Sequence, residues 1–168
     1  SGDFRFFGFD DKLRNRGGNS RDDIHYAVSI AKKNNNWLYY GKQLEKFDVS
    51  EVKNMENLFK DVRFNKSLAG WNVSNVTSMN GMFQDNRLFG YNIANDQGIT
   101  DWNTQNVTSM SSMFNGCINF NQNISGWNVS NVKNMNGMFS TATAFNQSLE
   151  GWHVGKVQNA AYMFDGCD

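Results

Sequence analysis

Four side chains of the sequence have the chemistry of nucleophiles or general bases: His25, His153, Cys117 and Cys167. Such a group acts only beside the groups that activate it, and these clusters leave recognisable local motifs. The sequence contains no phosphate-binding glycine loop, no metal-ligand spacing and no nucleophile motif. We therefore predict a protein that is not an enzyme and that holds no metal or cofactor. A hydrolase that uses His153 as its base is the least favoured alternative.

Methionine and tryptophan offer two further kinds of chemistry. Thioether sulfur binds Cu(I), and an exposed indole ring stacks on sugars or bases. In this sequence both residue types recur beside valine and phenylalanine at fixed spacing, which is typical of core packing. We interpret the methionines as core filling and the tryptophans as a buried wall, with an exposed tryptophan column as the alternative. The tryptophans concerned are Trp71, Trp102, Trp127 and Trp152.

These residues recur because the sequence is a repeat. Three copies read WNVSNVTSMNGMF, WNTQNVTSMSSMF and WNVSNVKNMNGMF, and more divergent copies begin at Phe47 and Trp152. From Phe47 onward the copies are spaced by 24, 31, 25 and 25 residues, the long interval reflecting an insertion between residues 91 and 101. The predicted divisions are a leader (1–19), a cap helix with a link (20–46) and five repeats (47–70, 71–101, 102–126, 127–151 and an incomplete 152–168).

A repeat of 25 residues cannot bury its own apolar face, so neighbouring copies must stack and form columns of equivalent side chains. Val76, Met79 and Phe83 follow one face of a short helix, and the later Phe-Asn-x-x-Leu/Ile segment is typical of an extended strand. The sequence therefore predicts an α/β repeat solenoid, a right-handed, leucine-rich-repeat-like stack of about five repeats with an N-terminal capping helix. Its structural columns contain the four tryptophans together with Phe83, Phe114, Phe139 and Phe164.

The two cysteines share one of these columns. Cys117 and Cys167 each follow the phenylalanine of their repeat by three residues, and Ala142 has this place in the repeat between them. Two steps of about 4.8 Å separate them by roughly 10 Å. A disulfide requires Cα atoms within about 7 Å. We therefore predict two free thiols that fill a slot for small residues.

The segment before the repeats predicts a capping helix near residues 21–33, with Ser20 as its N-cap and Ile24, Ala27 and Val28 on its apolar face. The leader is aperiodic and rich in phenylalanine, and an exposed apolar segment of this kind is typical of a contact site. We expect the leader to bind a protein partner. Its candidate contact residues are Phe4, Phe6, Phe7, Phe9, Arg14 and Arg16.

Asparagine recurs at nearly fixed positions in and around the predicted strands. In repeats it most often supplies hydrogen bonds to turns, and a ligand-binding outer face is the alternative. Alternation in the sequence does not decide which strand face points outward. The residues of this candidate outer face are Asn65, Asn92, Asn121, Asn123 and Asn146.

Charge and hydropathy exclude two classes of partner. Sixteen basic residues balance sixteen acidic ones without a basic stripe, so we expect no nucleic acid. No apolar run approaches the roughly 18 residues of a transmembrane helix, so we expect no membrane-spanning segment of the chain's own. The fifth repeat stops after its predicted helix, from which we expect either a longer natural chain or a partner on the last edge.

The pattern W-[ND]-V-S-x-V-x-x-M-x-x-M-F, followed by F-N-Q-x-[IL]-x-x-W, resembles the BspA-like leucine-rich repeats of the DUF285 type, also called the mycoplasma lipoprotein repeat. The resemblance covers about residues 20–168. It implies a surface-exposed or secreted interaction protein without catalytic residues, located outside the cell or on its surface. The lumen of an organelle in a microalga or another protist is the alternative location.

The expected function is therefore a non-catalytic protein–protein interaction module, a structural or accessory subunit docked on a larger assembly or surface. A secreted or cell-surface adhesin that binds a glycan or a host protein is the alternative.

Overall fold

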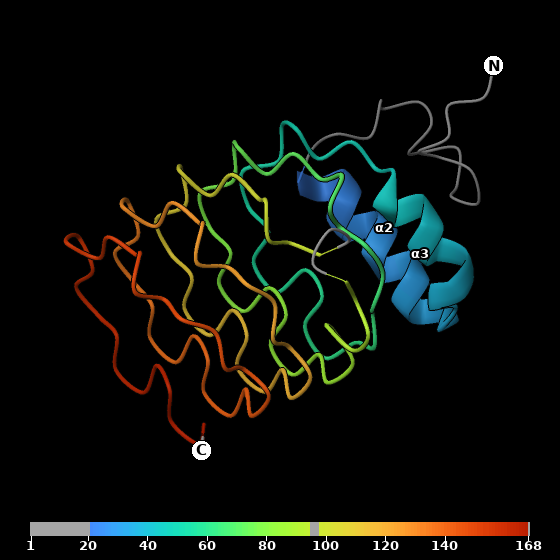
Figure 1. Cartoon of the computed structure of the whole chain (residues 1–168). Coiled ribbons are helices and arrows are strands. Elements are labelled where there is room, and N and C mark those ends of the chain that lie inside the picture. The colour runs from blue at the N-terminus through green and yellow to red at the C-terminus, as the bar shows by residue number, and fades with distance from the viewer. Residues whose placement is uncertain (1–20, 95–97, 168) are drawn as a thin grey trace.

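The computed structural model describes residues 21–94 and 98–167. Two helices, α2 (Arg21–Asn34) and α3 (Trp37–Glu45), precede the repeats. Figure 1 shows them together at one end of a stack of similar chain turns, with the C-terminal repeat at the opposite end. Each turn of the stack corresponds to one copy of the repeat, so equivalent residues of successive copies lie beside one another.

The predicted α/β solenoid, with a helix and a strand in every repeat, is wrong. Within the described residues the helices are α2 and α3 alone, and no strand is present. Isolated parallel bridges join successive repeats instead, one between each neighbouring pair. The repeats are therefore built from turns and irregular backbone and are not leucine-rich-repeat-like. The bridging residues are Asn54, Ser78, Ser109, Asn134 and Asn159.

The second repeat shows why helical spacing did not produce a helix. An α-helix donates each backbone N–H to the carbonyl four residues earlier. Here Met82 N donates to Met79 O, only three residues earlier, at 3.2 Å. Gly81 between them has φ +62°, and its N–H donates to Ser111 O of the next repeat at 2.8 Å. Tight turns reproduce the i, i+3 spacing of a helix, so the spacing alone does not distinguish the two structures.

The predicted strands fail for a different reason: side chains make the contacts that a backbone ladder would make. Asn65 Nδ2 donates to Tyr91 O at 2.8 Å, and Asn65 Oδ1 accepts from Gly90 N at 3.0 Å. Gln147 Nε2 donates to Asn121 O at 3.1 Å. Because these amide groups bridge neighbouring repeats, the backbone is not required to extend and pair as a sheet.

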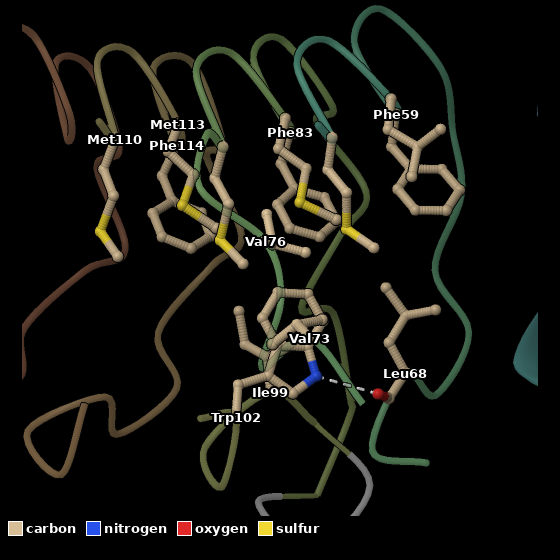
Figure 2. Close-up of a cluster of buried hydrophobic side chains, with 14 of the residues drawn as sticks. Phe59, Leu68, Val73, Val76, Phe83, Ile99, Trp102, Met110, Met113 and Phe114 are labelled. Atoms are coloured by element: carbon tan, nitrogen blue, oxygen red, sulfur yellow. Dashed lines mark hydrogen bonds between the residues drawn. The ribbon is translucent and has the colours of Figure 1, made fainter. Parts of the chain in front are cut away.

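The core is organised around a row of parallel phenylalanine rings, part of which is visible in Figure 2. Neighbouring rings have centroids 5.5–5.7 Å apart and planes within 11° of each other. Met and Val columns are buried beside this row, as expected for core filling. Offset stacking adds to the free energy gained from burial of the rings. The rings in this row belong to Phe59, Phe83, Phe114, Phe139 and Phe164.

The tryptophan column is a buried wall, as the repeat predicts, with every ring at most 8% exposed. Each indole Nε1 donates to a backbone carbonyl from an earlier part of the chain. The acceptor residue stands three positions before the aromatic residue that begins the preceding repeat. Figure 2 shows one of these bonds, from Trp102 Nε1 to Leu68 O at 3.0 Å. The column therefore fixes the register between repeats as well as filling the core. The other bonds are Trp71 to Leu44, Trp127 to Ile99 and Trp152 to Ile124.

Helix α2 confirms the helix predicted near residues 21–33, and its predicted apolar residues are buried against the first repeat. Ser20, the predicted N-cap, lies outside the described residues. The link predicted after this helix contains α3, whose N-cap Asn36 accepts from Tyr39 N at 3.1 Å. The apolar pattern did not reveal α3 because Leu38 is 71% exposed, while Gln43 is buried. Neither helix is long and apolar enough to span a membrane.

Gly90→Ala is expected to destabilise the fold by at least about 1–2 kcal/mol, the usual cost of a left-handed conformation for a residue with a Cβ atom. Gly90 has φ +95°, and an added Cβ would lie 2.9 Å from Phe120 Cα of the next repeat. The neighbouring backbone cannot yield without separating two repeats. Urea unfolding of the variant measures the loss. Gly126→Ala is the control because nothing lies within 4 Å of its Cβ position. Equal stability of the two variants would contradict this account.

Candidate interaction surface

The predicted leader contacts, Phe4, Phe6, Phe7, Phe9, Arg14 and Arg16, lie outside the described residues. The other predicted surface, the asparagine face, is described in full. Asn65 and Asn121 are engaged between repeats, Asn121 Oδ1 accepting from Asn146 N at 2.7 Å. Asn123 Oδ1 closes a local turn by accepting from Ser125 N at 3.0 Å. Asn92 is exposed with φ +55°. The structure therefore uses most of these residues for turns and for repeat pairing.

The backbone of each repeat carries a row of four N–H groups that point toward the next repeat. In the fourth repeat, Met135, Gly137, Phe139 and Thr141 donate to carbonyls of the fifth at 2.7–2.8 Å. The first three repeats make the same four bonds, all between 2.7 and 3.0 Å. The second and fourth donors always have positive φ, and this alternation turns every N–H of the row in one direction.

The fifth repeat has the same row without acceptors. The donors are the N–H groups of Ala160, Tyr162, Phe164 and Gly166, and among the described residues no acceptor lies in front of them. Tyr162 and Gly166 have φ +58° and +74°, so the conformation of the row is preserved. The carbonyl groups that precede these donors face the fourth repeat and accept its N–H groups. They belong to Asn159, Ala161, Met163 and Asp165. We call residues 160–166 the donor edge.

Exposed aromatic side chains accompany these donors. Phe164 ends the row of phenylalanine rings and is 50% exposed, whereas Phe139 in the same column is fully buried. Tyr162 is 73% exposed. Phe164 stacks on Phe139 with one face, at a centroid distance of 5.5 Å. The donor edge thus combines apolar area with a line of hydrogen-bond donors, a pairing that is typical of protein contact sites.

The hydrogen-bonded peptide units give the donor edge a positive partial charge. Asn57 N donates to Asn80 O, and Gly81 N, which belongs to the same peptide unit as Asn80 O, donates to Ser111 O. Equivalent bonds continue through the later repeats to the peptide unit between Ala161 and Tyr162. Peptide dipoles aligned head to tail add, as they do along an α-helix, and their N–H end is positive. At the opposite end of the stack, His25 Nε2 of α2 lies 3.3 Å from Asn54 O. The donor edge therefore favours carbonyl oxygens or anions.

The two cysteines are free, as predicted, and share their column with the buried Ala142. Cys117 Sγ donates to Phe83 O at 2.7 Å, and Cys167 Sγ donates to Phe139 O at 2.7 Å. Burial raises the pKa of the Cys117 thiol far above its ordinary value, and the charge of Asp85 adds to the rise. Cys117 is therefore a core residue and not an activated nucleophile.

Cys117 is expected to make the fold less stable in alkali. Above pH 9.0, the ordinary pKa of a thiol, the unfolded chain loses this proton while the native chain keeps it. The free energy of unfolding should then fall by about 1.4 kcal/mol per pH unit from this group. Urea unfolding at pH 8 and pH 10 measures the effect. Cys117→Ala, which has the side chain found at Ala142, should remove it. An identical pH dependence in both proteins would contradict the assignment.

The remaining sequence candidates do not assemble into a chemical site. His153 is exposed in the fifth repeat, and His25 lies at the other end of the stack beside Asn54. Among the residues that the structure describes, no group of three His, Cys, Asp or Glu side chains is arranged to hold a metal ion. The donor edge itself was missed in the sequence because backbone direction does not appear in residue type.

The family model described as "Mycoplasma protein of unknown function, DUF285" matches the chain twice, over residues 27–95 and 88–168. No curated protein and no solved structure gives a significant match. The two matches include all five repeats and most of α2. This chain is therefore a member of the DUF285 family.

Proposed function

We propose that this protein is a non-catalytic protein–protein interaction module, a structural or accessory subunit that docks on a larger assembly or surface. The observation that supports the proposal is the donor edge, where Phe164 and Tyr162 are exposed beside four N–H groups that face no acceptor among the residues that the structure describes. Main-chain hydrogen bonds at an exposed edge, with side chains that add selectivity, are a common way to bind a polypeptide. The location that we propose is the cell surface or the extracellular space.

The chemistry of the potential reactive groups supports the non-catalytic part of the proposal. Cys117 is buried with a raised pKa, and its Sγ is engaged with Phe83 O. His25 Nε2 lies against Asn54 O at the junction of α2 with the first repeat. These groups contribute to the fold at positions remote from one another. A reproducible turnover that is lost in His153→Ala would overturn the non-catalytic proposal.

The direct test captures partners with the tagged full chain. Extract from the source organism is cross-linked mildly, and proteins that copurify are identified by mass spectrometry. We expect Tyr162→Glu and Phe164→Glu to lose the captured protein, because each places a carboxylate on the donor edge. Tyr91→Glu is the matched control, since Tyr91 is an aromatic residue that is 55% exposed away from this edge. Failure to capture any protein above the level of an untagged control would overturn the proposal.

Deletion of residues 1–19 tests the predicted leader contact in the same experiment. If the leader contributes to docking, the truncated chain should recover less partner while the melting curve stays unchanged. Full recovery by the truncated chain, combined with loss in Phe164→Glu, would assign docking to the donor edge alone. Full recovery in both would show that neither surface holds the partner.

A further inference from the structure

The dipeptide Asn-Gly recurs in the repeats, and in water it is the dipeptide most prone to spontaneous loss of ammonia. Glycine has no side chain to hinder its backbone nitrogen, which attacks Cγ of the preceding asparagine. Because the dipeptides are chemically alike, differences between their rates in the folded chain must come from their surroundings. The three copies are Asn80–Gly81, Asn115–Gly116 and Asn136–Gly137.

The stack protects all three dipeptides through the glycine nitrogen. Each of these N–H groups donates to a carbonyl of the next repeat at 2.8 Å. The nitrogen has to leave its acceptor and lose its proton before it can attack. Reaction at any of the dipeptides therefore requires two neighbouring repeats to separate locally. The three bonds run from Gly81 to Ser111 O, from Gly116 to Ser140 O and from Gly137 to Ala161 O.

The asparagine side chains of the first and third dipeptides have surroundings that also oppose the reaction. Asn80 Oδ1 accepts from Ser109 Oγ and, at 2.8 Å, from Ser111 N, so this amide is held on the next repeat. Asn136 Oδ1 is buried and has no hydrogen-bond partner among the described residues. Attack on Asn136 Cγ would place the negative charge of the tetrahedral intermediate on an oxygen that no donor stabilises.

The side chain of Asn115 is under neither restraint. Asn115 is half-buried, and its amide makes no hydrogen bond to any residue that the structure describes. Its polar atoms are not among the buried ones that lack a partner, so water reaches the amide and solvates the oxygen as charge develops there. Only the backbone bond from Gly116 to Ser140 O has to open before Asn115 reacts.

We propose that Asn115–Gly116 is a site of spontaneous deamidation in the folded chain. Gly116 N forms a bond to Asn115 Cγ, the Cγ–Nδ2 bond breaks, and ammonia leaves with the proton from Gly116 N. Water then opens the succinimide ring at either carbonyl and produces aspartate or isoaspartate. The reaction needs water alone, so this inference is independent of the proposed interaction function.

The modification should weaken the contact between the third and fourth repeats. The succinimide has no hydrogen on Gly116 N and cannot donate to Ser140 O. Isoaspartate adds a methylene group to the backbone between Phe114 and Gly116, whose N–H groups donate to alternate carbonyls of the fourth repeat. The lengthened backbone no longer matches the spacing of these carbonyls. We therefore expect modified chains to unfold more readily than unmodified ones.

Peptide mapping by mass spectrometry of the full chain, aged in mildly alkaline buffer, tests the proposal. We expect Asn115 to react at least about tenfold faster than Asn80, as for an opening that breaks about two fewer hydrogen bonds. Asn136 should also react more slowly than Asn115. In concentrated urea, where the stack is lost, the three rates should converge.

Two results of this experiment would overturn the proposal. One is a set of rate ratios that is the same in the folded and the unfolded chain. The other is no reaction at Asn115 in the folded chain during a period in which the unfolded chain reacts completely. No partner is present in these samples, so either result would leave the interaction function standing.

Asn115→Gln separates this site from other changes that occur on ageing. Glutamine keeps the amide, but attack by the next nitrogen would have to form a six-membered ring, which is much slower. The melting temperature of the unmodified chain should fall as the fraction modified at Asn115 rises, whereas that of Asn115→Gln should stay constant over the same period. Equal falls in the two proteins would show that Asn115 is not the position whose modification weakens the stack, and would overturn its assignment.

Discussion

Trp127→Ala is expected to lower the free energy of unfolding by about 3–5 kcal/mol, the usual cost of truncating a large aromatic core residue. Trp127 is 2% exposed and stacks on Trp102 at a centroid distance of 6.2 Å. Its Nε1 donates to Ile99 O at 2.9 Å, so the substitution also leaves a buried carbonyl without its donor. Urea unfolding followed by circular dichroism measures the loss.

Trp127→Phe separates the two contributions. The smaller aromatic ring keeps most of the apolar area but cannot donate to Ile99 O. We expect this variant to lose about 1–3 kcal/mol, the cost of an unsatisfied buried acceptor. Unchanged stability in Trp127→Ala would mean that the tryptophan column does not hold the stack together.

The second large effect is expected at Asn86, a fully buried polar residue in the column of the cysteines. Asn86 Nδ2 donates to Phe64 O at 3.1 Å, and its Oδ1 accepts from Phe89 N at 3.1 Å. Asn86→Ala removes the side-chain donor and the side-chain acceptor together, and it leaves Phe64 O and Phe89 N without these hydrogen bonds. We expect a loss of about 2–3 kcal/mol in urea unfolding, at the upper end for such groups.

Asn86→Cys provides the matched comparison because Cys117 occupies the same column and donates to Phe83 O. The cysteine variant should be more stable than the alanine variant, since its thiol retains a donor in the slot. An alanine variant as stable as the unmodified chain would show that the hydrogen bonds of Asn86 do not contribute to the fold.

The sequence predicted which residues are buried much better than it predicted the backbone that buries them. The columns of Trp102, Met79 and Phe114 follow from the repeat, because stacking of equivalent side chains is the only way for a short repeat to form a core. The helix assigned to residues 76–83 failed because i, i+3 spacing is shared by tight turns. The positive φ of Gly81 and Asp85 decides between the two, and at a position such as Asp85 residue type alone gives little signal.

Polar detail was the least predictable part of the molecule. Asn86 follows Phe83 at the position where the other repeats have valine, cysteine or alanine, and only the structure shows its buried amide bonding to the backbone of two segments. The acceptors of the indole groups are likewise backbone carbonyls, which every residue possesses. The same reason hid the donor edge, because four N–H groups become a surface feature only when the direction of the peptide units is known.

Residue-resolved hydrogen exchange of the free, monomeric chain tests the claim that the stack presents an open donor edge most directly. In a ¹⁵N-labelled sample, the amides of Ala160, Tyr162, Phe164 and Gly166 should exchange within about tenfold of the rate for an unstructured peptide. The equivalent amides of Met135, Gly137, Phe139 and Thr141 donate at 2.7–2.8 Å and should be protected by more than about a hundredfold. Equal protection of the two rows would show that the edge is covered within the chain and would contradict the account.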